Sequence, residues 1–222
     1  MSGTFVRWPN SLRSAAPKNK LARVAIDDPA PFQRLFIALA VPPAVRQELG
    51  RAQGRWQRHL PPGAIRWTRP DQFHVTLQFL GDVPAAQVAA VETSLARICA
   101  TFPSLRLRAQ GLGFFPSPHQ PRVMWAGASD GHGQLAELHR QIASALCWLT
   151  PEEPAEEFIG HITLGRFKPG HHAAIPKLLE FAAGMFDRHF GDWDAGAVEM
   201  VRSELTSAGA EHTVLAVFPL AG

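Results

Sequence analysis

Apolar residues follow two periods along this chain, and the change between them predicts an α+β protein. An apolar run at Leu35–Val41 ends at two prolines and predicts a short buried strand. Apolar positions then recur every three or four residues, as in a helix with one buried face. The same two patterns alternate to the end of the chain. The expected strands are 65–68, 73–80, 105–109, 123–127, 158–167, 198–205 and 212–220, and the expected helices are 45–60, 88–98, 135–149 and 175–186.

The order of these elements favours antiparallel sheets. Expected strands occur in pairs between single helices, whereas a doubly wound parallel sheet alternates one strand with one helix. A Pro- and Gly-rich segment from Gly111 to Pro121 is expected to be a loop. The last two strands are expected to flank a turn at Ala208–Gly209.

The beginning of the chain differs from the rest. Residues 1–32 keep no period and carry scattered basic side chains, so we expect a flexible basic tail there. No apolar segment of a secretory signal is present, and a frayed tail fits better than an organellar transit peptide. The remaining residues, 33–222, are expected to form one domain of two lobes.

Composition narrows the classes of function. The chain is 46% hydrophobic and 18% charged, which excludes intrinsic disorder. Its 22 Lys and Arg residues against 19 Asp and Glu residues give a net charge of +3. That excess is too small for a polybasic binder but allows one local anion site. Two cysteines exclude a disulfide framework and a four-cysteine zinc site. No apolar run approaches the roughly 18 residues of a membrane span, so a cytoplasmic location without a membrane partner is expected.

One short pattern of His, apolar, Thr, apolar occurs twice, at His74–Leu77 and at His161–Leu164. Both copies fall in predicted strands, where residues two apart point to the same face. Each histidine therefore stands beside its threonine, while the apolar residues point into the core. Either copy alone is most simply a half-exposed strand. Two equivalent copies can instead meet across a cleft, as a general acid and a general base around a small anion.

Besides the two motifs, several ordered segments of the chain follow a known family pattern: Arg34–Leu39, Trp67–Pro70, His74–Gly81, Pro121–Gly127, His161–Arg166, Ser203–Leu205 and Thr213–Leu215. In these segments the chain resembles the 2H phosphoesterases, and among them the RNA 2′,3′-cyclic phosphodiesterases, historically called 2′-5′ RNA ligases. It departs from the family pattern at Ile159–Gly160, where Arg-Pro is common, and at His212, where Tyr is common.

The resemblance implies a fold of two antiparallel sheets that face each other across a cleft, with helices outside and the C-terminal strands returned to the N-terminal lobe. It implies that His161 accepts a proton from water and that His74 donates one to the leaving ribose oxygen. Thr76, Thr163 and Arg166 are then expected to bind the phosphate. The implied reaction opens a 2′,3′-cyclic phosphate at an RNA end to a 2′-phosphate, without a metal or cofactor, and its reverse is 2′-5′ ligation.

By the same resemblance the partner is RNA with cyclic phosphate ends, such as tRNA fragments, and the protein is expected to be a monomer. Two rival functions stay open: a phosphodiesterase for small cyclic nucleotides or 2′-5′ linkages, and an RNA-binding module of the same fold without turnover. The pair His171–His172 has no third metal ligand at a recognisable spacing. Residues that either line an electropositive, base-stacking groove or serve the surface and core are Arg66, Trp67, Arg69, Arg122, Trp125 and Lys168.

Overall fold

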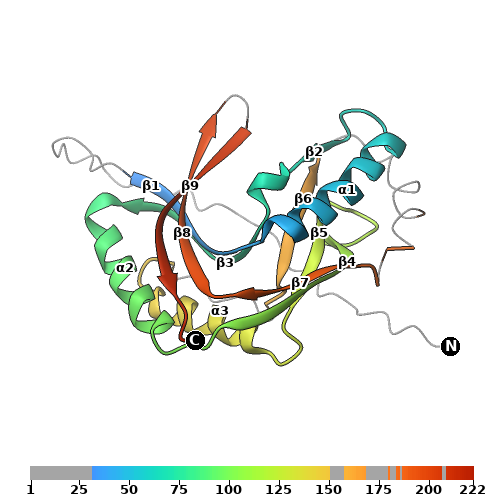
Figure 1. Ribbon diagram of the computed structural model, residues 1–222. Coiled ribbons are helices and arrows are strands. Elements are labelled where there is room, and N and C mark those ends of the chain that lie inside the picture. The colour runs from blue at the N-terminus through green and yellow to red at the C-terminus, as the bar shows by residue number, and fades with distance from the viewer. Residues whose placement is uncertain (1–31, 151–157, 169–179, 181–183, 186, 207–208) are drawn as a thin grey trace, which may run out of the picture.

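The chain folds into a curled antiparallel sheet with helices on its outside, as seen in a computed structural model (Figure 1). The structure describes residues 32–150, 158–168, 180, 184–185, 187–206 and 209–222. Its helices are α1 (Pro43–His59), η1 (Pro70–Gln72, a 3-10 turn), α2 (Ala85–Cys99) and α3 (Gln134–Ala145). Its strands are β1 (Phe32–Ala40), β2 (Ile65–Trp67), β3 (His74–Pro84), β4 (Leu105–Phe115), β5 (Val123–Ser129), β6 (His161–Phe167), β7 (His189–Ala195), β8 (Ala197–Thr206) and β9 (Gly209–Pro219).

Two groups of strands make the two lobes. One lobe has the order β3-β1-β8-β9, and the other has the order β7-β4-β5-β6 with β2 beside β6. The predicted antiparallel α+β fold is confirmed, including the return of β8 and β9 to the lobe of β1. The two expected sheets are joined, however, where Val75 of β3 pairs with Ile162 of β6. The lobes therefore share one continuous sheet.

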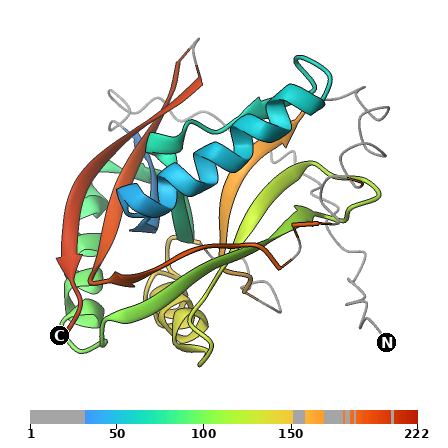
Figure 2. The ribbon, with the colours of Figure 1, turned by 45° about the vertical axis from the view of Figure 1, so that its right-hand side comes forward.

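Two helices pack against the lobe opposite to that of the strand they follow. Helix α1 follows β1 but contacts β7, and it also contacts η1, whereas α3 follows β5 but contacts β3. Helix α2 follows β3 and contacts β3, β8 and β9 of the same lobe. Figure 2 shows α1 crossing in front of the sheet, away from α2 and α3. Helix α1 begins with Pro43, a residue suited to the first helical turn because its missing N–H has no intrahelical partner there. It buries one stripe at steps of four, three and four residues: Val45, Leu49, Ala52 and Trp56.

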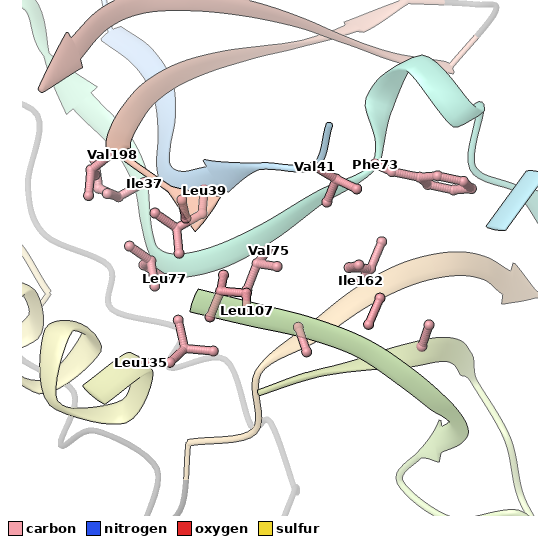
Figure 3. Packing of buried hydrophobic residues seen from close by; sticks show 14 of the residues in the cluster. Ile37, Leu39, Val41, Phe73, Val75, Leu77, Leu107, Leu135, Ile162 and Val198 are labelled. Atoms are coloured by element: carbon pink, nitrogen blue, oxygen red, sulfur yellow. The ribbon is translucent and has the colours of Figure 1, made fainter. Parts of the chain in front are cut away.

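One continuous core underlies the central strands. Figure 3 shows the side chains of Val75 and Leu77 from β3 in the same buried cluster as Ile162 from β6 and Leu39 from β1. Residues alternate between the two faces of a strand, so the intervening positions of β3 and β6 point away from this core. Those positions belong to the two His-x-Thr motifs.

The expected loop at Gly111–Pro121 is wrong over its first five residues, because β4 continues to Phe115. Gly111 adopts a φ of +73°, and the register with β5 shifts between Gln110 and Leu112. A bulge at a glycine thus lets the strand continue through a segment whose composition is typical of a loop.

Strand β7 was not expected from the sequence, because its alternation is broken. Phe190 and Trp193 are both buried although they are three residues apart. Gly191 between them has a φ of +138°, and the register with β4 shifts beside it. At an irregularity of this kind, the odd-numbered and even-numbered residues of the strand exchange faces, so that a different set points into the core.

Several expectations fall on residues outside the described part of the chain. They are the tail at 1–32, of which only Phe32 is described, as the first residue of β1, nearly all of the helix at 175–186, and Ala208 of the expected turn. Within the described residues, no helix is long and apolar enough to cross a membrane.

A buried glutamine of α1 holds β2 and β6 together. Gln53 is 4% exposed, and its Nε2 donates to the carbonyls of Thr68 (2.7 Å) and Leu164 (2.9 Å). Leu164 directly follows Thr163 of the second motif, so this side chain fixes the backbone beside that motif. A buried polar group is stable there because its hydrogen bonds are made.

We predict that Gln53→Leu lowers the free energy of unfolding by about 1–3 kcal/mol, since two carbonyls lose a buried donor. Gln57→Leu on the exposed face of the same helix is the matched control, with an expected change within about 0.5 kcal/mol. Urea denaturation measures both. Equal stability of the two variants would contradict the role of this side chain.

Candidate active site

The two repeated motifs meet where the lobes join. Val75 and Ile162, the second residues of the motifs, are Cα partners in an antiparallel pair, and both are fully buried. In this arrangement the residue before one partner lies opposite the residue after the other. Each histidine is therefore placed opposite the threonine of the other motif, on the face away from the core. The four residues related in this way are His74, Thr76, His161 and Thr163.

A cleft of about 570 Å³ lies over this face. Of the site residues expected from the sequence, His74, Thr76, Thr163 and Arg166 line the cleft. His161 stands beside them, half-buried, with its ring centroid 5.0 Å from that of Phe115 and 6.0 Å from that of Trp125. The fold thus brings together on one surface residues that are 87 positions apart.

Both imidazoles are held by the same backbone contact. The Nδ1 of His74 lies 2.8 Å from the carbonyl oxygen of Gln72, and the Nδ1 of His161 lies 2.8 Å from that of Ile159. A carbonyl oxygen only accepts, so Nδ1 carries the proton in each ring. In the neutral ring the Nε2 atom is then the one with a free lone pair, available to take a proton. The repeated contact gives the two histidines the same tautomer.

Burial lowers the pKa of both imidazoles and so favours their neutral forms. It lowers the pKa of His74 to about 4, helped by the nearby charges of His212, His161 and Arg46, although the bond to the Gln72 carbonyl raises it. Burial and, to a lesser degree, Arg166 also lower the pKa of His161. Without an anion, both rings are neutral at neutral pH. A bound phosphate raises both pKa values by its negative charge and so favours one protonated ring.

The charged side chains that line the cleft are mostly basic. Among the described residues, four arginines and one glutamate contribute to its wall: Arg34, Arg66, Arg69, Arg166 and Glu211. Arg69 is neutralised by a two-bond contact with Asp71, at 2.7 and 3.1 Å. The remaining excess of positive charge suits an anionic ligand.

Some of the other residues that the sequence suggests for the groove line the cleft, and others do not. Trp67 lines the cleft but packs partly against the core, and Trp125 lies beside His161 with its indole across the backbone of Gly113. Arg66 and Arg69 line the cleft, whereas Arg122 and Lys168 are not among the residues of its wall. His171 and His172 lie outside the described residues.

Gln72 and Phe36 are not expected from the sequence as parts of the site, whereas His212 is noted there as a departure from the family pattern. Gln72 donates its side-chain Nε2 to the carbonyl of Ala210 (2.6 Å), which ties η1 to the β8–β9 hairpin. The rings of Phe36 and His212 flank His74, at centroid distances of 4.8 and 5.4 Å. These contacts cross between elements far apart in sequence, so no local pattern predicts them.

Among the described residues, no group of three or more His, Cys, Asp or Glu side chains is arranged to hold a metal ion. The chemistry available from the described side chains is acid–base and electrostatic: two imidazoles, two hydroxyls and arginines around one cleft.

This fold and this pair of motifs define a phosphoesterase of the two-histidine class. A family model described as LigT-like phosphoesterase matches residues 39–125. Proteins named RNA 2′,3′-cyclic phosphodiesterase from Aquifex aeolicus and Thermus thermophilus are 33% and 34% identical, over 71% and 85% of this chain and 82% and 91% of their own lengths. The chain belongs to the LigT-like phosphoesterase family.

Solved structures agree with this assignment. A crystal structure from Thermus thermophilus is 31% identical, with a TM-score of 0.68 over 84% of this chain and 97% of that one. Escherichia coli LigT in complex with 3′-AMP has a TM-score of 0.66 at 23% identity, over 86% of this chain and 99% of that one, which supports the fold.

We predict that His74 makes the protein sensitive to acid. Its pKa in the folded state lies below the usual 6.5, so the folded state binds this proton less readily than the unfolded state. The associated stability is present above pH 6.5 and is lost as the pH falls towards 4. In His74→Gln the free energy of unfolding should therefore fall by less between pH 7 and pH 4, with a difference of the order of 3 kcal/mol.

Urea denaturation at several pH values measures this difference. His132→Gln, at an exposed turn, is the control and should follow the wild type. Parallel curves for wild type and His74→Gln would show that burial of His74 does not affect acid stability.

Proposed function

We propose that this protein hydrolyses the 2′,3′-cyclic phosphate at RNA ends to a 2′-phosphate. The observation that carries the proposal is the meeting of the two His-x-Thr motifs at one antiparallel pair, with both imidazoles bound through Nδ1 to backbone carbonyls. Two oriented rings beside one basic cleft suit in-line opening of a cyclic phosphodiester. The names of the relatives in Aquifex aeolicus and Thermus thermophilus point to the same reaction.

In the proposed mechanism, Nε2 of His161 accepts a proton from the attacking water, and Nε2 of protonated His74 donates one to the departing ribose oxygen. Water forms the new bond to phosphorus as the bond to the ribose oxygen breaks. Each proton-transfer group typically contributes about 10²- to 10⁴-fold in rate. Burial opposes the charged form of His74. The negative charge of the bound phosphate raises the pKa of this ring, so that the ring is protonated and can act as the acid.

Thr76, Thr163 and Arg166 are proposed to bind the non-bridging phosphate oxygens, where negative charge develops in the transition state. The hydroxyls flank the histidines through the strand register, and Arg166 lines the same cleft. Microscopic reversibility also permits 2′-5′ ligation of a cyclic phosphate to a 5′-hydroxyl, but in dilute solution water outcompetes the hydroxyl.

The proposed substrate is RNA with cyclic phosphate ends, with tRNA fragments as one source. A monomeric state and a cytoplasmic location stay predictions. The rival functions are a phosphodiesterase for small cyclic nucleotides and a binding module without turnover. The orientation of both histidines favours turnover over binding alone.

The decisive experiment gives the protein 2′,3′-cyclic mononucleotides and a short RNA ending in a cyclic phosphate, with excess EDTA present. We expect hydrolysis to 2′-phosphate at an unchanged rate, because the proposed steps use only side chains. Binding of the RNA without turnover would support the binding module instead. Loss of activity that a divalent ion restores would refute the mechanism.

The pH dependence follows from the lowered pKa values. The productive form needs one neutral and one protonated ring, and both pKa values lie below 6.5 in the free protein. We therefore predict a bell-shaped profile of kcat/KM with its maximum below pH 6.5. The profile of kcat should lie at higher pH, because bound phosphate raises both pKa values. A kcat/KM maximum at or above pH 7 would argue against neutral rings in the free protein.

A substrate with an activated aryl leaving group distinguishes the acid from the base. His74→Ala and His161→Ala should each lose several orders of magnitude on RNA, and the double variant little more, because the two groups act together. On the aryl phosphodiester, which needs no protonation of its leaving group, His74→Ala should recover most of its loss. Recovery by His161→Ala instead would reverse the two roles.

A further inference from the structure

Two arginines stand side by side on the wall of the cleft. Arg66 of β2 and Arg166 of β6 are Cα partners in an antiparallel pair, so their side chains leave the sheet on the same face. Both line the cleft. Like charges directly opposite each other in a sheet are destabilising, so this pair has a cost in the free protein.

Within the described part of the chain, no carboxylate compensates this pair: neither Arg66 nor Arg166 has an ion-pair partner within 4.0 Å. Some other arginines are paired, such as Arg106 with Asp194 and Arg108 with Asp192. Burial and the charge of Arg66 also lower the pKa of Arg166. Two uncompensated guanidinium groups in a cleft are suited to an anion that the protein does not itself provide.

The two arginines of the pair lie on different strands. Arg166 is three residues beyond Thr163, about 10 Å along the strand. Arg66 lies on β2, which pairs with β6 alone among the described strands and so stands outside the path that joins the lobes. Arg166 thus shares β6 with His161 and Thr163, whereas Arg66 lies on the neighbouring strand and belongs to neither motif.

We infer that Arg66 binds the internucleotide phosphate next to the cyclic end, and that the cleft thereby selects RNA ends over cyclic mononucleotides. This inference rests on the proposed function. A cyclic mononucleotide has one phosphate, which Arg166 and the two motifs bind. An RNA end adds a phosphodiester on the 5′ side of its terminal nucleoside. Among the described residues of the cleft wall, Glu211 is the one carboxylate, and it lies on β9 of the other lobe, whereas Arg66 lies on β2.

The test compares kcat/KM for 2′,3′-cyclic AMP with kcat/KM for the dinucleotide ApA ending in a cyclic phosphate. The wild type should prefer the dinucleotide, and Arg66→Gln should lower the ratio of the two values about tenfold. Arg97→Gln, at the exposed end of α2, is the matched loss of one positive charge and should keep the wild-type ratio. Because Arg66→Gln relieves repulsion between like charges, it should fold at least as stably as the wild type.

Salt dependence gives a second measurement that needs no variant. Each phosphate contact of a single strand contributes a slope of about −0.7 to the logarithm of affinity against the logarithm of salt concentration. In the wild type, the logarithm of kcat/KM should fall more steeply with the logarithm of salt concentration for the dinucleotide than for 2′,3′-cyclic AMP, with a difference in slope of about 0.7. Arg66→Gln should remove the difference.

Equal losses on both substrates in Arg66→Gln would overturn the inference, and so would an unchanged ratio or equal salt slopes in the wild type. Failure of the proposed function is distinguishable, because the wild type would then hydrolyse neither substrate.

Discussion

The site depends on the pairing of Val75 with Ile162. This single antiparallel contact joins the two lobes and sets the register that places each histidine opposite the threonine of the other motif. Side chains alternate along a strand, so a slip of one residue in either strand would turn its histidine into the core and an apolar residue into the cleft. Full burial of Val75 and Ile162 opposes such a slip, because either side chain would lose its apolar contacts. Stability of the core and geometry of the site are therefore the same constraint.

The two kinds of basic group in the cleft differ in charge at neutral pH, although burial lowers the pKa of His74, His161 and Arg166 alike. Burial keeps both imidazoles neutral until an anion binds, whereas a guanidinium group has so high an ordinary pKa that the arginines retain their charge and attract that anion. Phosphate binding and protonation of one imidazole are therefore linked, because the negative charge of the phosphate that the arginines attract also favours a protonated ring. The backbone bonds to Gln72 and Ile159 keep Nδ1 protonated in both rings, so the change in protonation falls on Nε2.

The two histidines make the same backbone contact, but residues outside the motifs give them different surroundings. Beside His74 lie Phe36 and His212, whereas Phe115 and Trp125 lie beside His161. Gln72 further connects the backbone that orients His74 to the β8–β9 hairpin. The two rings can thus share a tautomer and still differ in environment, which two different proton-transfer roles require.

Local patterns in the sequence were sufficient for most strands and helices and for the paired motifs, because the two-residue and 3.6-residue periods report directly which face is buried. They were insufficient at β7, where a bulge at Gly191 breaks the alternation, and in β4, where Gly111 continues a strand. The sequence by itself determined that each histidine lies beside a threonine. Only the tertiary structure decided that the two motifs meet, that Gln53 and Gln72 hold the strands and the hairpin, and that Arg66 faces Arg166. These contacts join elements distant in the chain, and their register follows from packing of the whole core, which no local period contains.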